Sequence, residues 1–216
     1  RRRSHAGCLS RATEKVSDGG HIAAEAFVDP SARLGPNVQV HPFAFVGAQA
    51  EVGEGTVIGP GAVVMAGSKI GARCVIAPEA VIGSRGFGYI FDGKQHRRIP
   101  QVGRVEIGDR SEIGPATCLD RAALDATSVG NDCRLGALIQ VAHNCRIGDD
   151  SQIGSGSGLA GSTRLGTGTR FGRRVGTAGH SDYGDHVTAD DLAGMTKTKI
   201  PGGTHWAGYP ARQVRS

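Results

Sequence analysis

Two histidines in this 216-residue chain have side chains and a spacing that suit proton-transfer chemistry. His143 lies in the segment IQVAHN (139–144), and His180 follows 37 residues later. An imidazole titrates near neutral pH, so either side chain could act as a general base toward an amine or a hydroxyl. Most histidines are solvated surface residues, and the spacing alone leaves that interpretation open. The sequence shows no Ser-His-Asp order, paired-carboxylate motif or Cys/His zinc pattern.

A period of six residues defines the elements that must position these histidines. An aliphatic residue stands at every sixth position through the first part of the chain: Ile22, Val28, Leu34, Val40, Val46, Val52, Ile58, Val64, Ile70, Ile76 and Ile82. Glycine follows many of these aliphatic residues, and a small or β-branched residue comes four positions after each. The pattern resumes at Ile107, Ile113 and Leu119, and after an insertion of four residues it runs from Val129 to Phe171. More degenerate turns follow near Thr177, Tyr183, Ala189 and Met195.

Six-residue periodicity is neither helical nor simple strand alternation, and it predicts a parallel β-helix with three flat faces. The aliphatic residues should be buried, among them Val40, Val52, Ile58, Ile70, Val141 and Ile153. The glycine after each aliphatic residue should permit backbone angles that a Cβ penalises. Three cysteines, Cys74, Cys133 and Cys145, occupy the small inward position, which predicts packing rather than redox chemistry.

A coil of three hexads closes every eighteen residues, so residues 18 apart should stack. Gly161 is therefore expected one coil above His143, and His180 two coils plus one residue above it. We expect a polar lead-in at 1–20, the β-helix at 21–200 and a tail at 201–216, with an excursion from the coil at about 84–104. Long loops of this kind are commonly functional.

Composition restricts the function classes further. The net charge is +5, yet no basic helix or aromatic-basic motif predicts a nucleic-acid binder, so an acidic protein or a phosphorylated substrate is the better partner. No apolar run is long enough for a transmembrane segment, and no secretory signal is evident. Five cysteines without disulfide-like spacing fit a reducing compartment, and we expect a cytoplasmic protein. The match of Gly156, Gly158 and Gly161 to a dinucleotide fingerprint lacks the strand-then-helix context, and we read these as three corner glycines.

Four segments together resemble the UDP-3-O-acylglucosamine N-acyltransferase family of lipid A biosynthesis. They are GFGY at 86–89, IPQVGRVEIGD at 99–109, LDRAALD at 119–125 and IQVAHN at 139–144. The resemblance covers roughly residues 21–212. It implies an all-β, left-handed parallel β-helix and a homotrimer with active sites between subunits. The family's N-terminal uridine-binding domain has no counterpart in the sequence.

The resemblance also implies an acyltransferase site that uses neither a metal nor a cofactor. An acyl chain would pass from acyl carrier protein to the glucosamine amine of a UDP-sugar. His143 matches the general base, Gly161 the oxyanion-binding N–H and His180 the second active-site histidine, while Gln140 and Asn144 are expected to contact substrate. Gly136 and Ala137 (GA) replace an Asp-Asn pair of the family, which removes a carboxylate that could orient His143.

Three other readings remain. One is a different hexapeptide-repeat sugar acyltransferase, and another is an inactive trimeric scaffold. The third is a zinc carbonic anhydrase on the same β-helix, with His143, His180 and His186 as ligands. The spacing puts His186 one hexad after His180, on the next face, so one chain does not easily bring all three imidazoles to one ion.

Overall fold

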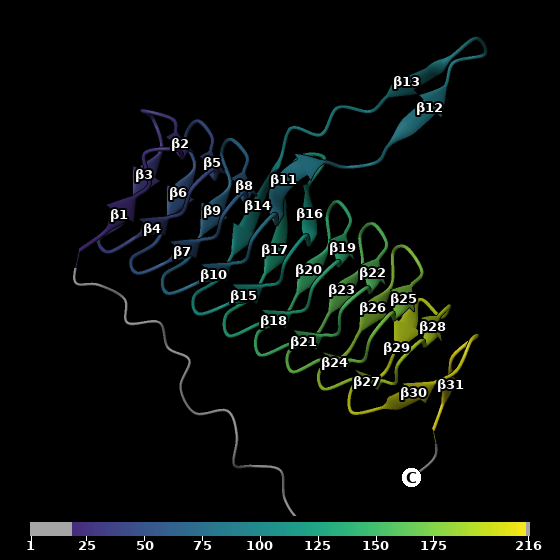
Figure 1. Ribbon diagram of the computed structural model, residues 1–216. Helices are drawn as coiled ribbons and strands as arrows, with labels where there is room; N and C mark the ends of the chain where they lie inside the picture. The colour runs from purple at the N-terminus through teal and green to yellow at the C-terminus, as the bar shows by residue number, and fades with distance from the viewer. Residues whose placement is uncertain (1–18, 215–216) are drawn as a thin grey trace, which may run out of the picture.

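The computed structural model describes residues 19–214, which form a three-sided coil of short parallel strands (Figure 1). Most strands have two residues, and each pairs in parallel with the strand one coil on; Val57, for example, is in register with Val75 eighteen residues later. Helices do not occur within residues 19–214. The all-β coil expected from the six-residue period is confirmed.

The strands form three long faces and one hairpin. Face 1 is built from β1 (His21–Ile22), β4 (Gln39–Val40), β7 (Val57–Ile58), β10 (Val75–Ile76), β15 (Glu112–Ile113), β18 (Arg134–Leu135), β21 (Gln152–Ile153), β24 (Arg170–Phe171), β27 (Thr188–Ala189), β30 (His205–Ala207) and β31 (Arg212–Gln213). Face 2 is built from β2 (Phe27–Val28), β5 (Phe45–Val46), β8 (Val63–Val64), β11 (Val81–Arg85), β16 (Cys118–Arg121), β19 (Gln140–Val141), β22 (Gly158–Leu159), β25 (Gly176–Thr177) and β28 (Gly194–Met195). Face 3 is built from β3 (Arg33–Leu34), β6 (Glu51–Val52), β9 (Lys69–Ile70), β14 (Arg104–Ile107), β17 (Ala126–Val129), β20 (Arg146–Ile147), β23 (Arg164–Leu165), β26 (Asp182–Tyr183) and β29 (Lys199–Ile200). The hairpin pairs β12 (Tyr89–Phe91) with β13 (His96–Arg98) in antiparallel fashion.

The second residue of a typical strand points into the coil. All six aliphatic residues chosen from the sequence are buried: Val40, Val52, Ile58, Ile70, Val141 and Ile153. The small inward position is also as predicted, because Cys74, Cys133 and Cys145 are fully buried. The interior is therefore a continuous stack of aliphatic layers, in which each coil contacts its neighbours, as in other solenoids.

Glycine follows the inward residues for a different reason from the backbone angles expected from the sequence. A Cβ on Gly53 would lie 2.5 Å from the carbonyl carbon of Gly71 in the next coil, and one on Gly154 would lie 2.4 Å from that of Gly172. These positions are glycine because successive coils approach closely there. The left-handed backbone conformation falls later in each turn and is often taken by other residues, such as Gln49 (φ 55°).

Both interruptions of the repeat leave the coil at one edge, the corner between face 2 and face 3. The longer one follows β11 and includes the hairpin; we call residues 84–104 the arm (Figure 1). The shorter one is the loop 122–125 between β16 and β17. A β-bulge at Gly83 (φ 93°) shifts the register of β11 against β16, so that Ser84 pairs with Asp120. Bulges of this kind re-aim side chains, often beside functional sites.

The C-terminal end of the coil extends beyond the expected boundary at residue 200. Strand β30 continues face 1, where Trp206 pairs with Ala189 and is buried. Strand β31 then returns antiparallel to β30. Residues 201–207 therefore belong to the coil, and the indole of Trp206 fills its interior where the aliphatic pattern ends. The expected lead-in at 1–20 lies almost wholly outside the described residues.

Candidate active site

His143 lies in the turn that follows β19, at the corner between face 2 and face 3. This is the same corner from which the arm and the loop 122–125 leave the coil. Its inward neighbour Val141 is buried, whereas the imidazole is half-buried on the outer surface, as the hexad register predicts. The two interruptions of the repeat therefore stand beside a histidine that the regular coil alone would leave open.

Asn144 fixes the protonation pattern of this imidazole. The Asn144 side-chain oxygen accepts the backbone N–H of Ala123 at 3.0 Å and lies 3.2 Å from Nδ1 of His143. Because the Ala123 N–H can only donate, the amide atom between the two groups must be the oxygen. In a neutral imidazole, Nδ1 must therefore carry the proton and Nε2 must hold the free lone pair. This tautomer is the one a general base needs at Nε2.

The Nε2 atom faces Gly161, one coil above, as the eighteen-residue spacing predicts. A Cβ on Gly161 would lie 2.8 Å from Nε2 and 2.9 Å from Cε1 of His143, so only glycine leaves room for the ring. The next backbone N–H, that of Ser162, donates to the His143 carbonyl at 3.0 Å. Within residues 19–214, no acceptor takes the Gly161 N–H. The Nε2 lone pair thus faces a residue whose own N–H has no acceptor among the described residues, which pairs a base with a hydrogen-bond donor.

His180 lies on the same corner, two coils above His143. Its backbone N–H donates to the Gly161 carbonyl at 2.9 Å, and its side chain is exposed. With coils about 4.8 Å apart, the two histidine backbones are roughly 10 Å apart along the axis. The two histidines therefore do not touch, but they lie along the same edge of the coil. His186 follows β26 and lies at the next corner, and among the described residues no group of three potential ligands is placed to hold a metal ion.

Asp120 is a site residue that the sequence reasoning did not single out. This carboxylate, on β16, is only 7% exposed, and it accepts hydrogen bonds from Ser84 Oγ at 2.6 Å and from Gln140 Nε2 at 2.9 Å. Burial raises the pKa of Asp120, and the bonds from Ser84 and Gln140 and the nearby His143 oppose that shift. Since the Gln140 nitrogen is engaged by Asp120, its carbonyl oxygen remains available on the outer surface. The bulge at Gly83, which no hexad count reveals, brings Ser84 to this carboxylate.

The base of the arm packs directly on His143. A Cβ on Gly86 would lie 2.8 Å from the His143 Cβ and 3.0 Å from the side-chain oxygen of Gln101, so the two strands of the arm converge on the imidazole. That Gln101 oxygen is buried and has no hydrogen-bond partner among the described residues. Buried amide oxygens are normally paired, so this one is an acceptor available to a bound group. Gly86 and Gln101 come from the GFGY and IPQ segments, whose role the periodicity left unexplained.

Face 2 differs from the other faces in what it presents to solvent. The first, outward residue of the face 3 strands is charged in most coils, whereas the first residue of every face 2 strand is uncharged: Phe27, Phe45, Val63, Val81, Cys118, Gln140, Gly158, Gly176 and Gly194. The last three form a stripe of glycines in register above Gln140. A Cβ on Gly158 or Gly176 would meet nothing within 4 Å, so the stripe is a smooth floor. At Gly194 the ring of Tyr209 covers it.

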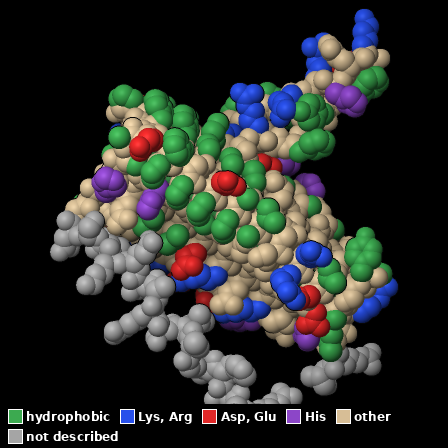
Figure 2. Space-filling view, in the orientation of Figure 1, with side chains coloured by type: hydrophobic (Ala, Val, Ile, Leu, Met, Phe, Trp, Pro, Cys, Tyr) green, Lys and Arg blue, Asp and Glu red, His purple; other side chains and the backbone are tan. Residues whose placement is uncertain are grey.

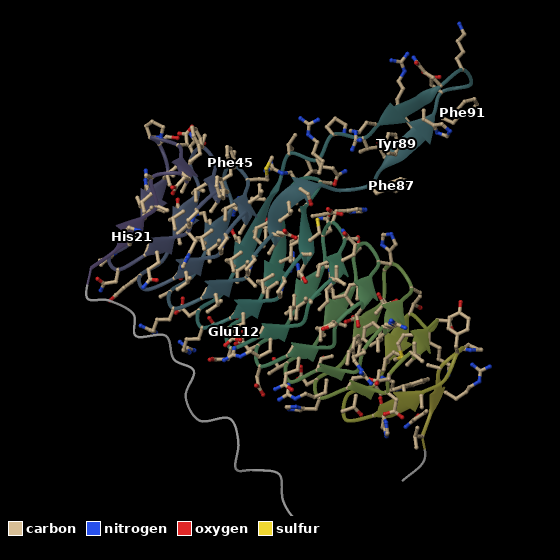
Figure 3. The ribbon with its side chains drawn as sticks, in the orientation of Figure 1. His21, Phe45, Phe87, Tyr89, Phe91 and Glu112 are labelled. Carbon is tan, nitrogen blue, oxygen red and sulfur yellow. The ribbon has the colours of Figure 1, made fainter. Side chains whose placement is uncertain are left out.

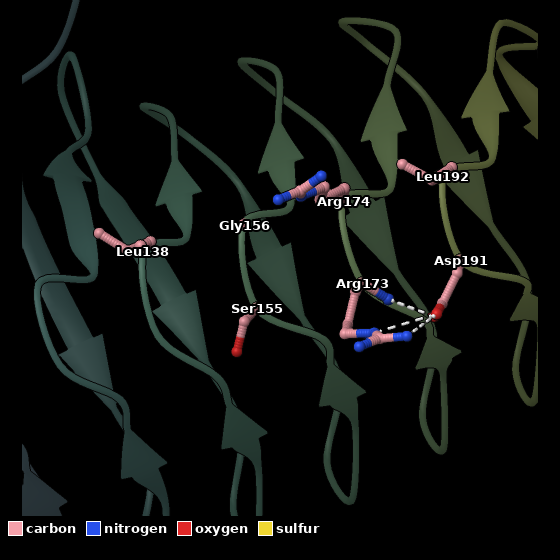
Figure 4. A pocket seen from close by; sticks show the side chains of 7 residues that line it. All are labelled: Leu138, Ser155, Gly156, Arg173, Arg174, Asp191 and Leu192. Atoms are coloured by element: carbon pink, nitrogen blue, oxygen red, sulfur yellow. Dashed lines mark hydrogen bonds and ion pairs between the residues drawn. The ribbon is translucent and has the colours of Figure 1, made fainter.

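Two hollows of the single chain lie beside this stripe, away from His143. One, of about 390 Å³, follows the corner between face 1 and face 2, from Leu138 past Gly156 and Arg174 to Leu192 (Figure 4). Another, of about 340 Å³, is lined by Gly176, Gly194 and Tyr209 among others. Neither is lined by His143, whose surroundings within the chain are the next coil at Gly161 and the base of the arm at Gly86.

Two sequence-based expectations need correction. Gly136 and Ala137 lie at the corner between face 1 and face 2, whereas His143 lies at the far end of β19. An Asp-Asn pair there would stand a full face away from His143 within the chain, and the orienting partner of the imidazole is Asn144. The three glycines of the dinucleotide-like match are not all corner residues, because Gly158 lies in strand β22.

The chain between residues 19 and 214 contains no helix that could span a membrane.

Comparison with known proteins gives a consistent set of relatives. The family model for bacterial transferase hexapeptide repeats (six repeats) matches residues 31–64, 49–84 and 126–161. A UDP-3-O-acylglucosamine N-acyltransferase of Methylorubrum extorquens is 37% identical over 137 residues, which cover 62% of this chain and 38% of that protein. The protein of the same name from Dechloromonas aromatica is 48% identical over 66 residues, covering 31% of this chain and 19% of that protein.

Solved structures agree on the architecture. A UDP-N-acetylglucosamine acyltransferase from Bacteroides fragilis superposes with a TM-score of 0.81 at 26% identity, over 90% of this chain and 74% of that one. The left-handed parallel β-helix expected from the sequence is thereby confirmed. The chain spans about two fifths of the length of the first curated relative it matches.

Proposed function

We propose that this chain, a relative of the UDP-3-O-acylglucosamine N-acyltransferases built on bacterial transferase hexapeptide repeats, is the catalytic β-helix of such an enzyme. The donor is an acyl carrier protein, the acceptor is the glucosamine amine of UDP-3-O-acylglucosamine, and the protein works in the cytoplasm. The observation that carries the proposal is the juxtaposition of the His143 Nε2 lone pair with the free N–H of Gly161. Sequence kinship with enzymes of that name supports the choice of substrate.

The transfer follows from this geometry. The acceptor nitrogen attacks the thioester carbonyl carbon, and Nε2 of His143 takes one proton from that nitrogen. The carbonyl oxygen becomes an oxyanion and accepts the Gly161 N–H. When the tetrahedral intermediate collapses, the C–S bond breaks, and the leaving thiolate takes the proton from the imidazolium. The products are an amide and a free thiol, and His143 is regenerated.

The side chains around His143 have supporting roles in this proposal. Asn144 holds the imidazole in the required tautomer, and the carbonyl oxygen of Gln140, turned outward by Asp120, accepts a hydrogen bond from the acceptor amine. His180, two coils above, binds the acceptor rather than taking its proton. The glycine stripe of face 2 provides a smooth floor for the acyl chain over about 10 Å, two coil spacings, and the ring of Tyr209 closes its far end.

The same face supports a homotrimer. Phe27 and Phe45 stack with ring centroids 5.1 Å apart and both remain exposed on face 2, and Phe43 is exposed at the neighbouring corner. An exposed apolar patch of this kind is typical of a surface that another chain covers. A second copy against face 2 would also cover the open glycine stripe.

The test is an acyl-transfer assay with the full chain and two variants. The parent should acylate UDP-3-O-acylglucosamine, and His143→Ala should lower kcat by about 10²–10⁴-fold, the usual contribution of a positioned base. His180→Ala should lower the rate less, and chelators should not change it. Both variants should keep the circular dichroism of the parent, because both side chains lie outside the packed coil. Near-full transfer by His143→Ala, or activity that metal removal abolishes and zinc restores, contradicts the proposal.

A second candidate acceptor is a sugar hydroxyl. It is favoured by one observation, the close superposition on enzymes named UDP-N-acetylglucosamine acyltransferases. His143 can serve an amine or a hydroxyl equally well. Offering UDP-3-O-acylglucosamine and UDP-N-acetylglucosamine as competing acceptors decides between them, because only one should yield product.

A further inference from the structure

The arm differs from the rest of the described chain in its balance of charge. Residues 84–104 contain five basic side chains and one acidic one: Arg85, Lys94, Arg97, Arg98, Arg104 and Asp92. The other described residues, 19–83 and 105–214, carry 14 Lys and Arg against 17 Asp and Glu. A strongly basic arm therefore projects from a slightly acidic coil, and Figure 2 shows Lys and Arg side chains along it. The overall net charge of +5 does not reveal this division.

The arm also presents aromatic rings to solvent. In the hairpin, Tyr89 pairs with Arg98 and Phe91 with His96, so these four side chains share one face of the ribbon. The Arg98 guanidinium lies 4.8 Å from the centre of the Tyr89 ring, and the ring of Phe87 meets Tyr89 edge-on at 5.3 Å. Phe87 is nevertheless 80% exposed and Phe91 62% exposed (Figure 3).

The stability of the hairpin itself does not account for its exposed aromatic and basic side chains. An isolated two-stranded hairpin is marginal in water, and exposed aromatic residues beside arginine are typical of the energetic centre of an interface. The surface is also convex and projects from the coil (Figure 1), whereas small-molecule sites are concave. A macromolecule with a negative surface is therefore the ligand that fits.

The arm connects that surface to the reacting atoms. Its first residues pack on the imidazole, because a Cβ on Gly86 would lie 2.8 Å from the His143 Cβ. From Gly86 to the turn at Asp92 the chain spans about six residues, or roughly 20 Å when extended. A protein held near the tip therefore lies too far away to place its own side chains at His143. It can deliver a group only on a long flexible tether.

We propose that the arm, residues 84–104, is the docking surface for the acidic protein that carries the activated acyl group. The inference rests on the proposed function and adds to it where the donor binds. The basic side chains attract the donor's acidic surface, Phe87 and Phe91 are its apolar anchors, and the thioester reaches His143 on its prosthetic tether. Electrostatic complementarity of this kind contributes mainly to the rate and specificity of encounter.

The test compares a protein donor with a small one, using the full chain. The donors are acyl-loaded acyl carrier protein and the corresponding acyl-pantetheine thioester. Lys94→Glu should raise KM for the protein donor about fivefold and Phe91→Ala about tenfold, while the values for acyl-pantetheine stay within twofold of the parent. Lys199→Glu, the same charge reversal on face 3, should change neither donor's KM. Added salt should raise KM for the protein donor more steeply in the parent than in Lys94→Glu.

Binding without turnover separates this inference from the proposed function. Fluorescence anisotropy of labelled acyl carrier protein should show binding to the parent and to Lys199→Glu, and weaker binding to Lys94→Glu. If the carrier binds through the arm but no acceptor is acylated, the docking surface stands and the proposed function is wrong. Equal losses with both donors would instead make the arm a wall of the active site. Unchanged KM for the protein donor, or loss of oligomer in the arm variants by light scattering, also overturns the docking surface.

Discussion

Adding a single methyl group at Gly161 tests the proposed contact between the base and the coil above it. In Gly161→Ala, the new Cβ would lie 2.8 Å from Nε2 and 2.9 Å from Cε1 of His143, whereas ordinary contact begins at 3.4 Å. The ring must therefore retreat by about half an ångström or more. That movement disturbs the 3.2 Å contact between Nδ1 and Asn144, which sets the tautomer.

The expected loss follows from the cost of misplacing a reacting group. A displacement approaching 1 Å lowers rates by about 10²-fold, so kcat/KM for Gly161→Ala should fall by about that factor. The fold should not change, because Gly161 does not have a left-handed backbone conformation that an alanine would strain. The thermal unfolding midpoint should therefore match that of the parent.

Gly179→Ala is the matched control. Gly179 occupies the same corner position one coil above Gly161, but a Cβ there would meet its nearest neighbour, the Gly161 carbonyl oxygen, at an ordinary 3.5 Å. Its kcat/KM should stay within about threefold of the parent. An NMR titration of the imidazoles gives a readout independent of turnover, in which the His143 signals should move in Gly161→Ala only. Parent-like activity and spectra in Gly161→Ala would refute the placement of Nε2 against Gly161.

Two further predictions concern the coil and its assembly. Burial raises the pKa of Cys145 from 9.0 to about 11, so above pH 9 the unfolded chain loses this proton first and stability falls. Between pH 7 and pH 10 the free energy of unfolding should fall by about 1.4 kcal/mol for this reason. In urea unfolding, Cys145→Ala should lose that part of the pH dependence. An unchanged pH dependence would contradict the burial of Cys145. If the chain forms the proposed homotrimer, Phe45→Glu, on face 2, should convert it to monomers in light scattering while Lys199→Glu stays trimeric. A trimeric Phe45→Glu would place the interface elsewhere.

The fold was predictable because its rule is local and repeats. Each hexad places one aliphatic residue inward, and eleven consecutive positions from Ile22 to Ile82 obey it. The core, the face of each strand and the stacking of residues 18 apart all follow from that period. The role of the glycines did not follow. The close approach that excludes a Cβ at Gly53 is set by the backbone of another coil.

The candidate site was predictable only in part. Residues inside the regular repeat, namely His143, Gly161 and His180, were placed in the correct coils by counting. Asp120 and Gln101 were not singled out, because irregular features supply their surroundings: the bulge at Gly83 brings Ser84 to Asp120, and the returning end of the arm brings Gln101 beside Gly86. A bulge changes the register by one residue, and no periodic count contains that information.

The sequence by itself determined a three-sided coil, its buried ladder and the alignment of His143 with Gly161, since these depend on spacing along the chain. Only the tertiary structure decided the tautomer of His143, because the Ala123 N–H that fixes Asn144 comes from the coil below. It also decided that the excess of basic over acidic side chains among the described residues lies in one projecting arm. Hydrogen-bond direction and the distribution of charge depend on which residues meet across coils, and that is a property of the folded chain alone.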